Sequence, residues 1–362
     1  MKYLILANNS GGLYRFRKEL MEHLLADGHI VYAATPFDAS VEELKSLGCN
    51  LIQVEMNRRG TNPLQELSLL SSYRKIIKKI HPDMIITYTI KPGIYGGLLA
   101  RKSKIPYAVN ITGLGTAFQE DGILRTAIVK LWMLALKSAK CVFFENEENA
   151  QVFIDLKIVD KLKVHVLHGA GVNLVDFPFT EYPAAEEQIH FLFIGRVMKE
   201  KGIDELLSAM QQLHLKYPNI VLDVVGWCEE DYEAKLNELQ DKGLVQFYGF
   251  QKDVTPFISK AHAFVLPSYH EGMANTLLES AAMGRPLITS NIHGCMEAVE
   301  DGKTGYLCEV GNVQSLSERM ECFINLPYEE KVQMGKLSHD YVAKYFDKKA
   351  VVQETVDVIY QN

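Results

Sequence analysis

The sequence lacks the features that mark membrane-spanning, secreted and disulfide-linked proteins. No apolar run approaches the roughly 20 residues that a membrane span requires. The first apolar run, at residues 3–7, is too short for a signal peptide and is followed by the polar Asn8-Asn9-Ser10. None of the six cysteines forms a C-x-x-C pair. These absences predict a cytoplasmic protein with reduced thiols.

An excess of positive charge is also missing. The chain has 38 Lys and Arg residues against 45 Asp and Glu residues, which gives a formal net charge of −7. A protein of this charge is a poor candidate for neutralising phosphates, so no nucleic-acid partner is expected. Hydrophobic residues make up 48% and charged residues 23%, which excludes a disordered or fibrous chain. The length of 362 residues predicts two domains.

Both halves of the chain alternate short apolar strands with amphipathic helices. The strands predicted in the first half are residues 3–7, 30–33, 84–88 and 107–111. After a break near residue 180, those of the second half are residues 189–194, 221–225, 245–248, 263–266 and 286–289. The pattern predicts an α/β protein of two Rossmann-like domains, each a doubly wound parallel sheet, that face each other across a ligand-binding cleft. The domains are expected at residues 1–178 and 179–340, with a final helix at 341–362.

The most informative segment is residues 267–279. Asn275 is expected to cap a helix, which places Glu271 in the preceding loop and Glu279 in the second turn. The first-turn N–H groups would offer a phosphate site, and a carboxylate beside it would bond sugar or ribose hydroxyls. A solvated Glu271, and a Glu279 that only completes the helix face, are the simpler alternatives for each residue alone.

Two cations follow the first predicted strand of the second half. Arg196 comes directly after the strand and its glycine, and Lys201 follows in the next turn. Both would lie at the carboxyl edge of the sheet, where two cations can hold a diphosphate leaving group. An ordinary pair of surface cations is the alternative.

Three motifs in order resemble glycosyltransferase family 4, the retaining, sugar-nucleotide-dependent enzymes of the GT-B fold. They are Gly195-Arg196…Lys201-Gly202, Pro267-Ser268…Glu271-Gly272…Glu279 and Asp301-Gly302…Gly305-Tyr306-Leu307. The first half resembles the family more loosely, through Gly11-Gly12, residues 111–115 and residues 143–173. These segments look like those of bacterial enzymes that extend lipid-linked saccharides for capsule, O-antigen or exopolysaccharide.

The resemblance implies transfer of a hexose-type sugar from a nucleotide-diphosphate sugar, with UDP favoured over GDP by family habit. The acceptor would be a lipid-linked saccharide or a polysaccharide. Residues 1–178 would bind the acceptor, residues 179–340 the donor, and the final helix would return toward the N-terminal domain. Neither a metal nor a cofactor is implied, and the absence of any Asp-x-Asp pair agrees with this.

The resemblance also implies roles for individual residues. Glu271 would face the transferred sugar, Glu279 would bind the ribose, and Arg196 and Lys201 would bind the diphosphate. The other donor contacts would be Gly12, Gly272, Asn275, Thr276 and Leu277, with Phe250 and Val254 at the base.

The acceptor side is less well assigned. It would include Thr112, Gly113 and Gly115. Many family members carry a His shortly after this Thr-Gly pair, and here none follows. The group that orients the acceptor is therefore unassigned.

The charge is unevenly divided between the halves. Residues 1–178 carry a net charge of +5 and residues 179–362 a net charge of −12. The first half contains basic pairs and an apolar segment at residues 123–136, which includes Trp132. A basic amphipathic helix of this kind can lie on an anionic membrane, with about 1 kcal/mol for each nearby cation. An ordinary helix buried on the flank of the sheet explains the segment equally well.

Two other functions remain open. A sugar-nucleotide epimerase of the same fold would need an acid/base array that the sequence does not reveal. A scaffold that binds a nucleotide sugar without catalysis would not need Glu271, Glu279, Arg196 and Lys201 together.

Overall fold

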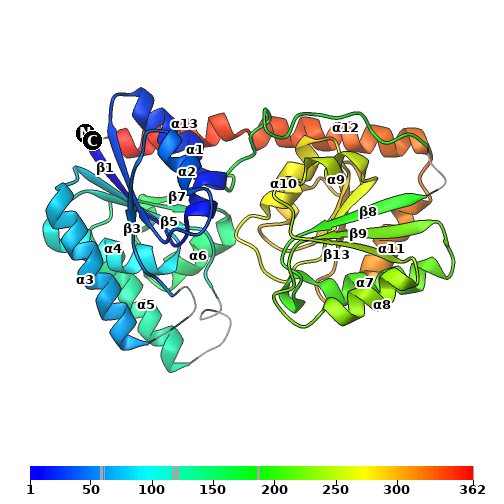
Figure 1. Ribbon diagram of the computed structural model, residues 1–362, viewed down its shortest axis with the longest axis horizontal. Coiled ribbons are helices and arrows are strands. Elements are labelled where there is room, and N and C mark those ends of the chain that lie inside the picture. The colour runs from blue at the N-terminus through cyan, green and yellow to red at the C-terminus, as the bar shows by residue number, and fades with distance from the viewer. Residues whose placement is uncertain (58–59, 61, 116–117, 119–121, 186–187, 362) are drawn as a thin grey trace. The chain divides into compact units, whose positions relative to one another are not determined.

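The computed structural model describes residues 1–57, 60, 62–115, 118, 122–185 and 188–361 (Figure 1). The chain forms two compact units. The first contains Met1–Ala170 and Lys349–Asn362, and the second contains Gly171–Lys348. The second unit therefore begins at Gly171 rather than at residue 179, and the chain returns to the first unit at Lys349 rather than at 341.

The first unit is built on a seven-stranded parallel sheet with the order β3-β2-β1-β4-β5-β6-β7. Its strands are β1 (Lys2–Leu6), β2 (Ile30–Thr35), β3 (Asn50–Gln53), β4 (Met84–Tyr88), β5 (Tyr107–Ile111), β6 (Cys141–Phe144) and β7 (Val164–Val166). The strand order reverses between β1 and β4, which is where doubly wound sheets bind ligands.

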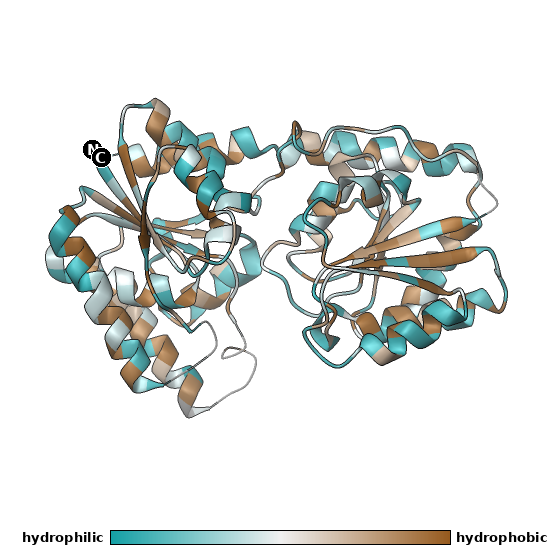
Figure 2. Cartoon of the chain, in the orientation of Figure 1, coloured by the Kyte–Doolittle hydropathy of each residue, from teal (hydrophilic) through white to brown (hydrophobic). Residues whose placement is uncertain are grey.

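Helices cover both faces of this sheet. They are α1 (Ser10–Ala26), α2 (Val41–Ser46), α3 (Pro63–Ile80), α4 (Ile90–Ser103), α5 (Ile123–Leu136), α6 (Glu147–Asp155) and α13 (Lys348–Tyr360). In β1, Leu4 and Leu6 pack with apolar residues of α3 to α6, whereas Tyr3 and Ile5 pack with α1, α2 and α13. Both cores follow from the two-residue period of a strand, and Figure 2 shows the resulting apolar strands.

The second unit contains a six-stranded parallel sheet with the order β10-β9-β8-β11-β12-β13. Its strands are β8 (Ile189–Ile194), β9 (Ile220–Val225), β10 (Val245–Gly249), β11 (Ala263–Leu266), β12 (Leu287–Ser290) and β13 (Gly305–Cys308). Its order reverses between β8 and β11. Together the two sheets confirm the α/β, doubly wound architecture that the sequence predicts.

Helices also lie on both sides of the second sheet (Figure 1). Those on one side are α7 (Ile203–His214), α8 (Glu233–Asp241) and α11 (Val313–Ile324), and those on the other are α9 (Thr255–Lys260), α10 (Asn275–Ala282) and α12 (Tyr328–Tyr345). Arg285 is fully buried in this unit. Its guanidinium donates hydrogen bonds to Ile258 O at 2.8 Å, Ser259 O at 2.9 Å and Glu181 O at 3.0 Å. This side chain therefore fastens the start of the unit to α9.

The expected single final helix is wrong, because the structure contains two helices there. Helix α12 ends at Tyr345 and contributes Met334 and Val342 to the second core. Asp347 then forms a bridge with Val172, and this extended pairing interrupts the helix. Helix α13 packs on the first unit, as expected, where Val351, Val356 and Ile359 join the core beneath α1.

Candidate active site

Two loops at the carboxyl edge of the second sheet are tied together by backbone contacts. Val197, after β8, donates to Trp227 O at 2.9 Å, and Glu229 donates back to Val197 O at 3.1 Å. Gly226 has a φ of 146°, and a Cβ there would lie 1.8 Å from Gly195 O. Only glycine permits so close an approach of the two loops. The loop that carries Arg196 is therefore fixed relative to residues 227–229.

Glu229 lies between two potential ligand-binding side chains. Trp227 donates its indole N–H to Glu229 Oε2 at 3.0 Å, and the other oxygen, Oε1, lies 3.8 Å from Arg196 Nη1. Glu229 thus connects the predicted diphosphate-binding arginine with an aromatic side chain.

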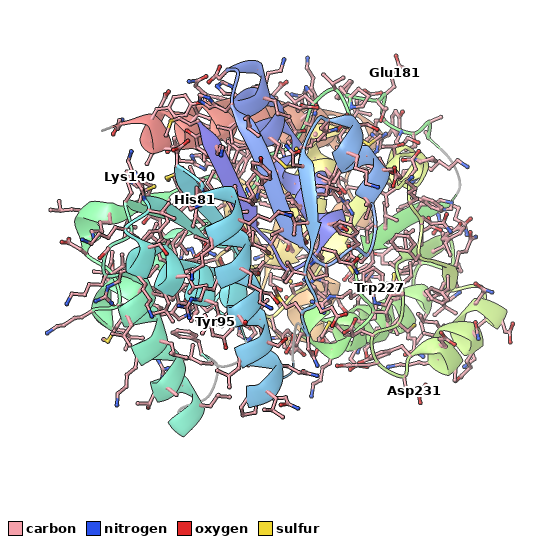
Figure 3. The ribbon with its side chains drawn as sticks, turned by 60° about the vertical axis from the view of Figure 1, so that its left-hand side comes forward. His81, Tyr95, Lys140, Glu181, Trp227 and Asp231 are labelled. Atoms are coloured by element: carbon pink, nitrogen blue, oxygen red, sulfur yellow. The ribbon has the colours of Figure 1, made fainter. Side chains whose placement is uncertain are left out.

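An exposed aromatic pair extends this cluster. Trp227 is 47% exposed and Phe250 is 64% exposed, and their ring centroids lie 5.7 Å apart at 59°. Figure 3 labels Trp227 in the segment between β9 and α8. Solvent-exposed aromatic rings at this edge can stack on a nucleobase. Sequence reasoning missed Trp227, although a Trp directly after a strand and a glycine was the available signal.

The expectation that Val254 contacts the base is wrong for its side chain. Val254 is only 6% exposed and belongs to the core of the second unit. Phe250 precedes it on the same loop and points its ring out of the core, since it remains mostly exposed. The aromatic pair, rather than Val254, offers a stacking surface.

The structure brings Lys201 and Glu271 together. Lys201 Nζ contacts Glu271 Oε1, and Ser268 Oγ donates to the same oxygen at 2.8 Å. The two charged side chains are only 17% and 12% exposed. An ammonium has three donors, so this contact leaves Lys201 able to bind phosphate oxygens as well. A partly buried ion pair of this kind keeps both groups in a defined position.

Glycines let neighbouring backbone segments pack closely around the Lys201–Glu271 pair. Gly202, with a φ of 69°, follows Lys201, and a Cβ there would lie 2.0 Å from Pro267 O. Gly294, with a φ of 86°, approaches the other side of the loop, and its Cβ would lie 2.8 Å from Glu271 O. The loop that carries Glu271 is thus packed closely on both sides. Gly305 is different, since it only allows β13 to approach β12 at Leu287.

Helix α10 begins one residue earlier than the sequence predicts. Asn275 is its first helical residue rather than its N-cap, and its side-chain Nδ2 donates to Met273 O at 3.4 Å. The preceding Ala274 offers no side-chain cap, which leaves the first turn open toward an anion. Thr276 lies half-buried in this turn, directly after Asn275.

Two other predicted donor residues of α10 are buried. The side chain of Leu277 is fully buried in the core, so only its backbone could contact a ligand. Glu279, one turn further on, is 4% exposed. A carboxylate so deeply placed requires polar partners.

In the first unit, Gly12 lies in the first turn of α1. Asn9 caps this helix, and its side-chain oxygen accepts the Gly12 N–H. The carboxylate of Asp38 accepts the N–H groups of Ser10 at 2.9 Å and Gly11 at 3.0 Å. A phosphate could reach the Gly12 N–H only after the Asn9 side chain rotates away.

The predicted acceptor residues follow β5 in the same unit. Gly113 and Gly115 have φ values of 148° and 75°, and Thr112 lies half-buried before them. A Cβ at Gly115 would lie 2.5 Å from Ile90 Cδ1. The loop therefore passes against the start of α4. Residues 116, 117 and 119–121 lie outside the described part of the chain.

Helix α5 is partly a buried flank of the first sheet. Trp132 is 1% exposed and packs against Gly93, where a Cβ would lie 2.5 Å from the indole ring. For Trp132, the structure therefore agrees with the second of the two alternatives, a helix buried on the flank of the sheet. The same helix exposes Leu124, Met133 and Leu134. Among the described residues, no helix combines the length and the apolar character needed to cross a bilayer.

The described part of the chain holds no group of three or more His, Cys, Asp or Glu side chains placed to bind a metal ion. Cations at the site are instead the side chains of Arg196 and Lys201.

Models of two protein families match the chain. The model "Glycosyl transferase 4-like" matches residues 4–146, and the model "Glycosyl transferases group 1" matches residues 177–339. Each match falls within one of the two structural units.

Similar proteins carry related names. An N,N'-diacetylbacillosaminyl-diphospho-undecaprenol alpha-1,3-N-acetylgalactosaminyltransferase of Campylobacter jejuni is 28% identical over 92% of each chain. A UDP-Gal:alpha-D-GlcNAc-diphosphoundecaprenol alpha-1,3-galactosyltransferase of Escherichia coli is 28% identical over 71% of this chain and 70% of its own. The crystal structure of a glycosyltransferase from Rickettsia africae has a TM-score of 0.81 at 19% identity, and the match covers 100% of this chain and 99% of that one.

Proposed function

This chain belongs to the glycosyltransferases that these two family models describe, and it has the GT-B fold. On this basis we propose which substrates it uses and what its site residues do. The donor is a UDP-sugar that carries a hexose-type sugar. The acceptor is a polyprenyl-diphosphate-linked saccharide or a related cell-surface glycan. The sugar is transferred with retention of its anomeric configuration.

The observation that carries the donor assignment is the grouping of side chains at one edge of the second sheet. The Lys201–Glu271 pair and the Arg196–Glu229–Trp227 cluster both lie in loops after parallel strands. An uncapped helix start follows at α10. Cations, an open helix N-terminus and exposed aromatic rings are the groups that bind a diphosphate and a base.

Different residues of this group bind different parts of the donor. Trp227 and Phe250 stack on the uracil, and Arg196 and Lys201 bind the diphosphate together with first-turn N–H groups of α10, near Asn275 and Thr276. Both cations stabilise the charge that develops as the diphosphate leaves. No protein-bound metal is required for this step.

The carboxylates act on the sugars. Glu271, at the loop before α10, hydrogen-bonds the transferred sugar, and Glu279 binds the ribose. In the transfer step, the bond between the anomeric carbon and the diphosphate oxygen breaks, and the acceptor hydroxyl oxygen forms the new bond on the same face. The hydroxyl proton passes to the departing phosphate oxygen. No strong protein base is then needed, which is consistent with the missing His after Thr112-Gly113.

The acceptor class rests on the two relatives, whose names both contain a diphospho-undecaprenol-linked acceptor. The second name also specifies a UDP-sugar donor. Within this chain, the loop with Thr112, Gly113 and Gly115 follows β5 at the carboxyl edge of the first sheet, where it would face the acceptor. Gly12, in the first turn of α1, would approach the diphosphate of the donor.

A transfer assay tests this function. The purified protein is incubated with UDP-hexoses and UDP-N-acetylhexosamines, with and without polyprenyl-diphosphate-linked monosaccharides. We expect UDP release that depends on the acceptor, a disaccharide product with the donor's anomeric configuration, and a thermal shift with UDP but not with GDP. Conversion of the sugar nucleotide without an acceptor would instead identify an epimerase. Ligand binding without turnover would identify a scaffold.

We further propose that the first unit rests on the inner face of an anionic membrane. Helix α3 exposes Leu64 by 77% and Leu67 by 63%, and its later turns expose four cations, Arg74, Lys75, Lys78 and Lys79. Helix α5, on the same face of the sheet, adds exposed Leu124, Met133 and Leu134 and exposed Lys130 and Lys137. Exposed apolar groups beside cations favour an anionic lipid surface. The basic pair Arg58-Arg59 lies outside the described residues.

Vesicle sedimentation tests the membrane contact. At low salt, the protein should sediment with vesicles that contain anionic lipid and remain in the supernatant with neutral vesicles. The double variant Leu64→Ser/Leu67→Ser should sediment less, whereas a change at an exposed leucine elsewhere, Leu215→Ser in the second unit, should have no effect. Equal recovery with both kinds of vesicle would contradict the proposal.

A further inference from the structure

A polar pocket lies at the carboxyl ends of β2 and β3 in the first unit. Its volume is about 370 Å³, within the roughly 300–1,000 Å³ of small-molecule sites. The beginnings of α3 and α4 form part of its wall. Apolar and hydrogen-bonding side chains line it together, among them Phe37, Met56, Gln53, Glu55, Gln65 and Glu66.

Lys91 builds one wall of this pocket. Its ammonium donates to Asn57 O at 2.7 Å and Gly60 O at 2.6 Å, and it also pairs with Glu66 of α3. These three contacts match the three donors of an ammonium group. Tyr95, labelled on α4 in Figure 3, also interacts with Glu66, and its pKa is raised mainly by burial and then by this carboxylate. Lys91 thus joins the loop after β3 to α3 and α4.

The position of Lys91 is unfavourable for its own helix. It is the second residue of α4, where a cation opposes the helix dipole. Thr89, just before the helix, has a φ of 72° and a ψ of 175°, a region that side chains rarely adopt. Backbone strain and an opposed charge therefore coincide at the start of α4, beside the pocket.

The described charged side chains of the pocket do not favour a diphosphate. Its described charged lining consists of Glu55, Glu66 and Lys91, and the single cation is already paired with Glu66. The amides of Gln53 and Gln65 each supply both donors and an acceptor. Phe37 and Met56 add apolar surface. Such a mixture suits a neutral ligand rich in hydroxyl groups.

The pocket lies beside the predicted acceptor residues of the same unit. Phe37 directly precedes Asp38, which binds Ser10 and Gly11 at the start of α1. Ile90, next to Lys91, contacts the Gly115 position. The strand order reverses beside β1. Strand β3 lies two strand spacings, about 10 Å, from β1. A ligand in this pocket would lie along the carboxyl edge of the sheet, at a distance from the acceptor hydroxyl that is glycosylated.

We propose that this pocket binds a neutral sugar residue of the acceptor, at a distance from the hydroxyl that is glycosylated. The assignment rests on the proposed transferase function, which it extends to the acceptor. Lys91 is a positioning residue, and the groups that touch the sugar are Gln53, Gln65 and the carboxylate of Glu66.

Saturation-transfer NMR on the full chain tests this pocket. The probes are N-acetylglucosamine, N-acetylgalactosamine, galactose and their disaccharides, with inorganic pyrophosphate as a competitor. At least one saccharide should give a signal that the Gln53→Ala/Gln65→Ala variant loses. The matched control Gln151→Ala, an exposed glutamine of α6 in the same unit, should keep it. Pyrophosphate should not displace the saccharide.

A kinetic readout separates this proposal from the transferase function. In the transfer assay, each single glutamine variant should raise the acceptor KM about fivefold to tenfold and leave the donor KM unchanged. Absence of any saccharide signal, a signal that survives the double variant, or displacement by pyrophosphate would each overturn the pocket assignment. UDP binding to the second unit, followed separately, reports on the donor site whatever the pocket does.

Discussion

Removing the indole ring of Trp227 should weaken UDP binding more than any other change to an exposed aromatic side chain. Stacking of a base on an aromatic ring contributes about 1–3 kcal/mol. Since 1.4 kcal/mol corresponds to a tenfold change in affinity, Trp227→Ala should raise the Kd for UDP about 5-fold to 150-fold. The ring is 47% exposed, so its loss leaves no large cavity in the core.

The two tryptophans of this chain provide the assay. Trp132 is 1% exposed in the first unit, whereas Trp227 lies at the proposed base site of the second. In a Trp132→Phe background, intrinsic fluorescence therefore reports on Trp227 alone. UDP should quench this signal with a saturable dependence on concentration. Calorimetric titration then gives the Kd of Trp227→Ala, which no longer has the reporter.

Two further variants separate stacking from positioning. Trp227→Phe keeps a ring but loses the hydrogen bond to Glu229, so its Kd should lie between those of the wild type and Trp227→Ala. Tyr345→Ala removes an exposed ring from the far end of α12 and should leave the Kd unchanged. Unchanged UDP affinity in Trp227→Ala, or no quenching by UDP, would refute the placement of the base.

Three other predictions concern catalysis and stability. Glu271→Gln should lower kcat about 10²-fold to 10³-fold with little change in the Kd for UDP, and equal kcat values would contradict its contact with the transferred sugar. Burial, followed by the charges of His190, Lys331 and Arg285, lowers the pKa of His262 from 6.5 to about 4. The unfolded chain therefore binds a proton more readily, and the second unit should lose up to about 3 kcal/mol of stability as the pH falls from 6.5 to 4. Calorimetry over this pH range should show a smaller loss for His262→Gln, and equal losses would exclude His262 as the cause. Arg285→Lys removes the planar guanidinium that donates to three carbonyls, so it should destabilise the second unit by about 1–3 kcal/mol. The loss would be measured as a lower Tm. An unchanged Tm would show that these hydrogen bonds do not hold the segment around Glu181 against α9.

Much of the fold could be predicted because local patterns recur along the chain. Short apolar runs such as residues 84–88 and 263–266 read as buried strands, and they lie in the centres of the two sheets. The break between α12 and α13 was harder to predict, because residues 341–360 have a continuous helical pattern. Only the pairing of Asp347 with Val172, distant in sequence, interrupts it.

The candidate site was predicted in part. Glu271 and Lys201 were identified from their motifs, but their mutual contact depends on a loop packing that Gly202 and Gly294 permit. Trp227 was missed, because its importance comes from exposure beside Phe250, and exposure cannot be read from a single residue. Val254 was misassigned for the same reason, since its neighbours bury it.

The sequence is enough to predict the two parallel sheets, the charge difference between the halves and the residue types at the proposed donor site. Periodicity, composition and motif order are local properties, and each survives in an unfolded chain. Only folding brings together Arg196 and Glu229, Lys201 and Glu271, and Lys91 and Glu66. These contacts join residues distant in the chain, and they depend on close backbone approaches that only packing can create.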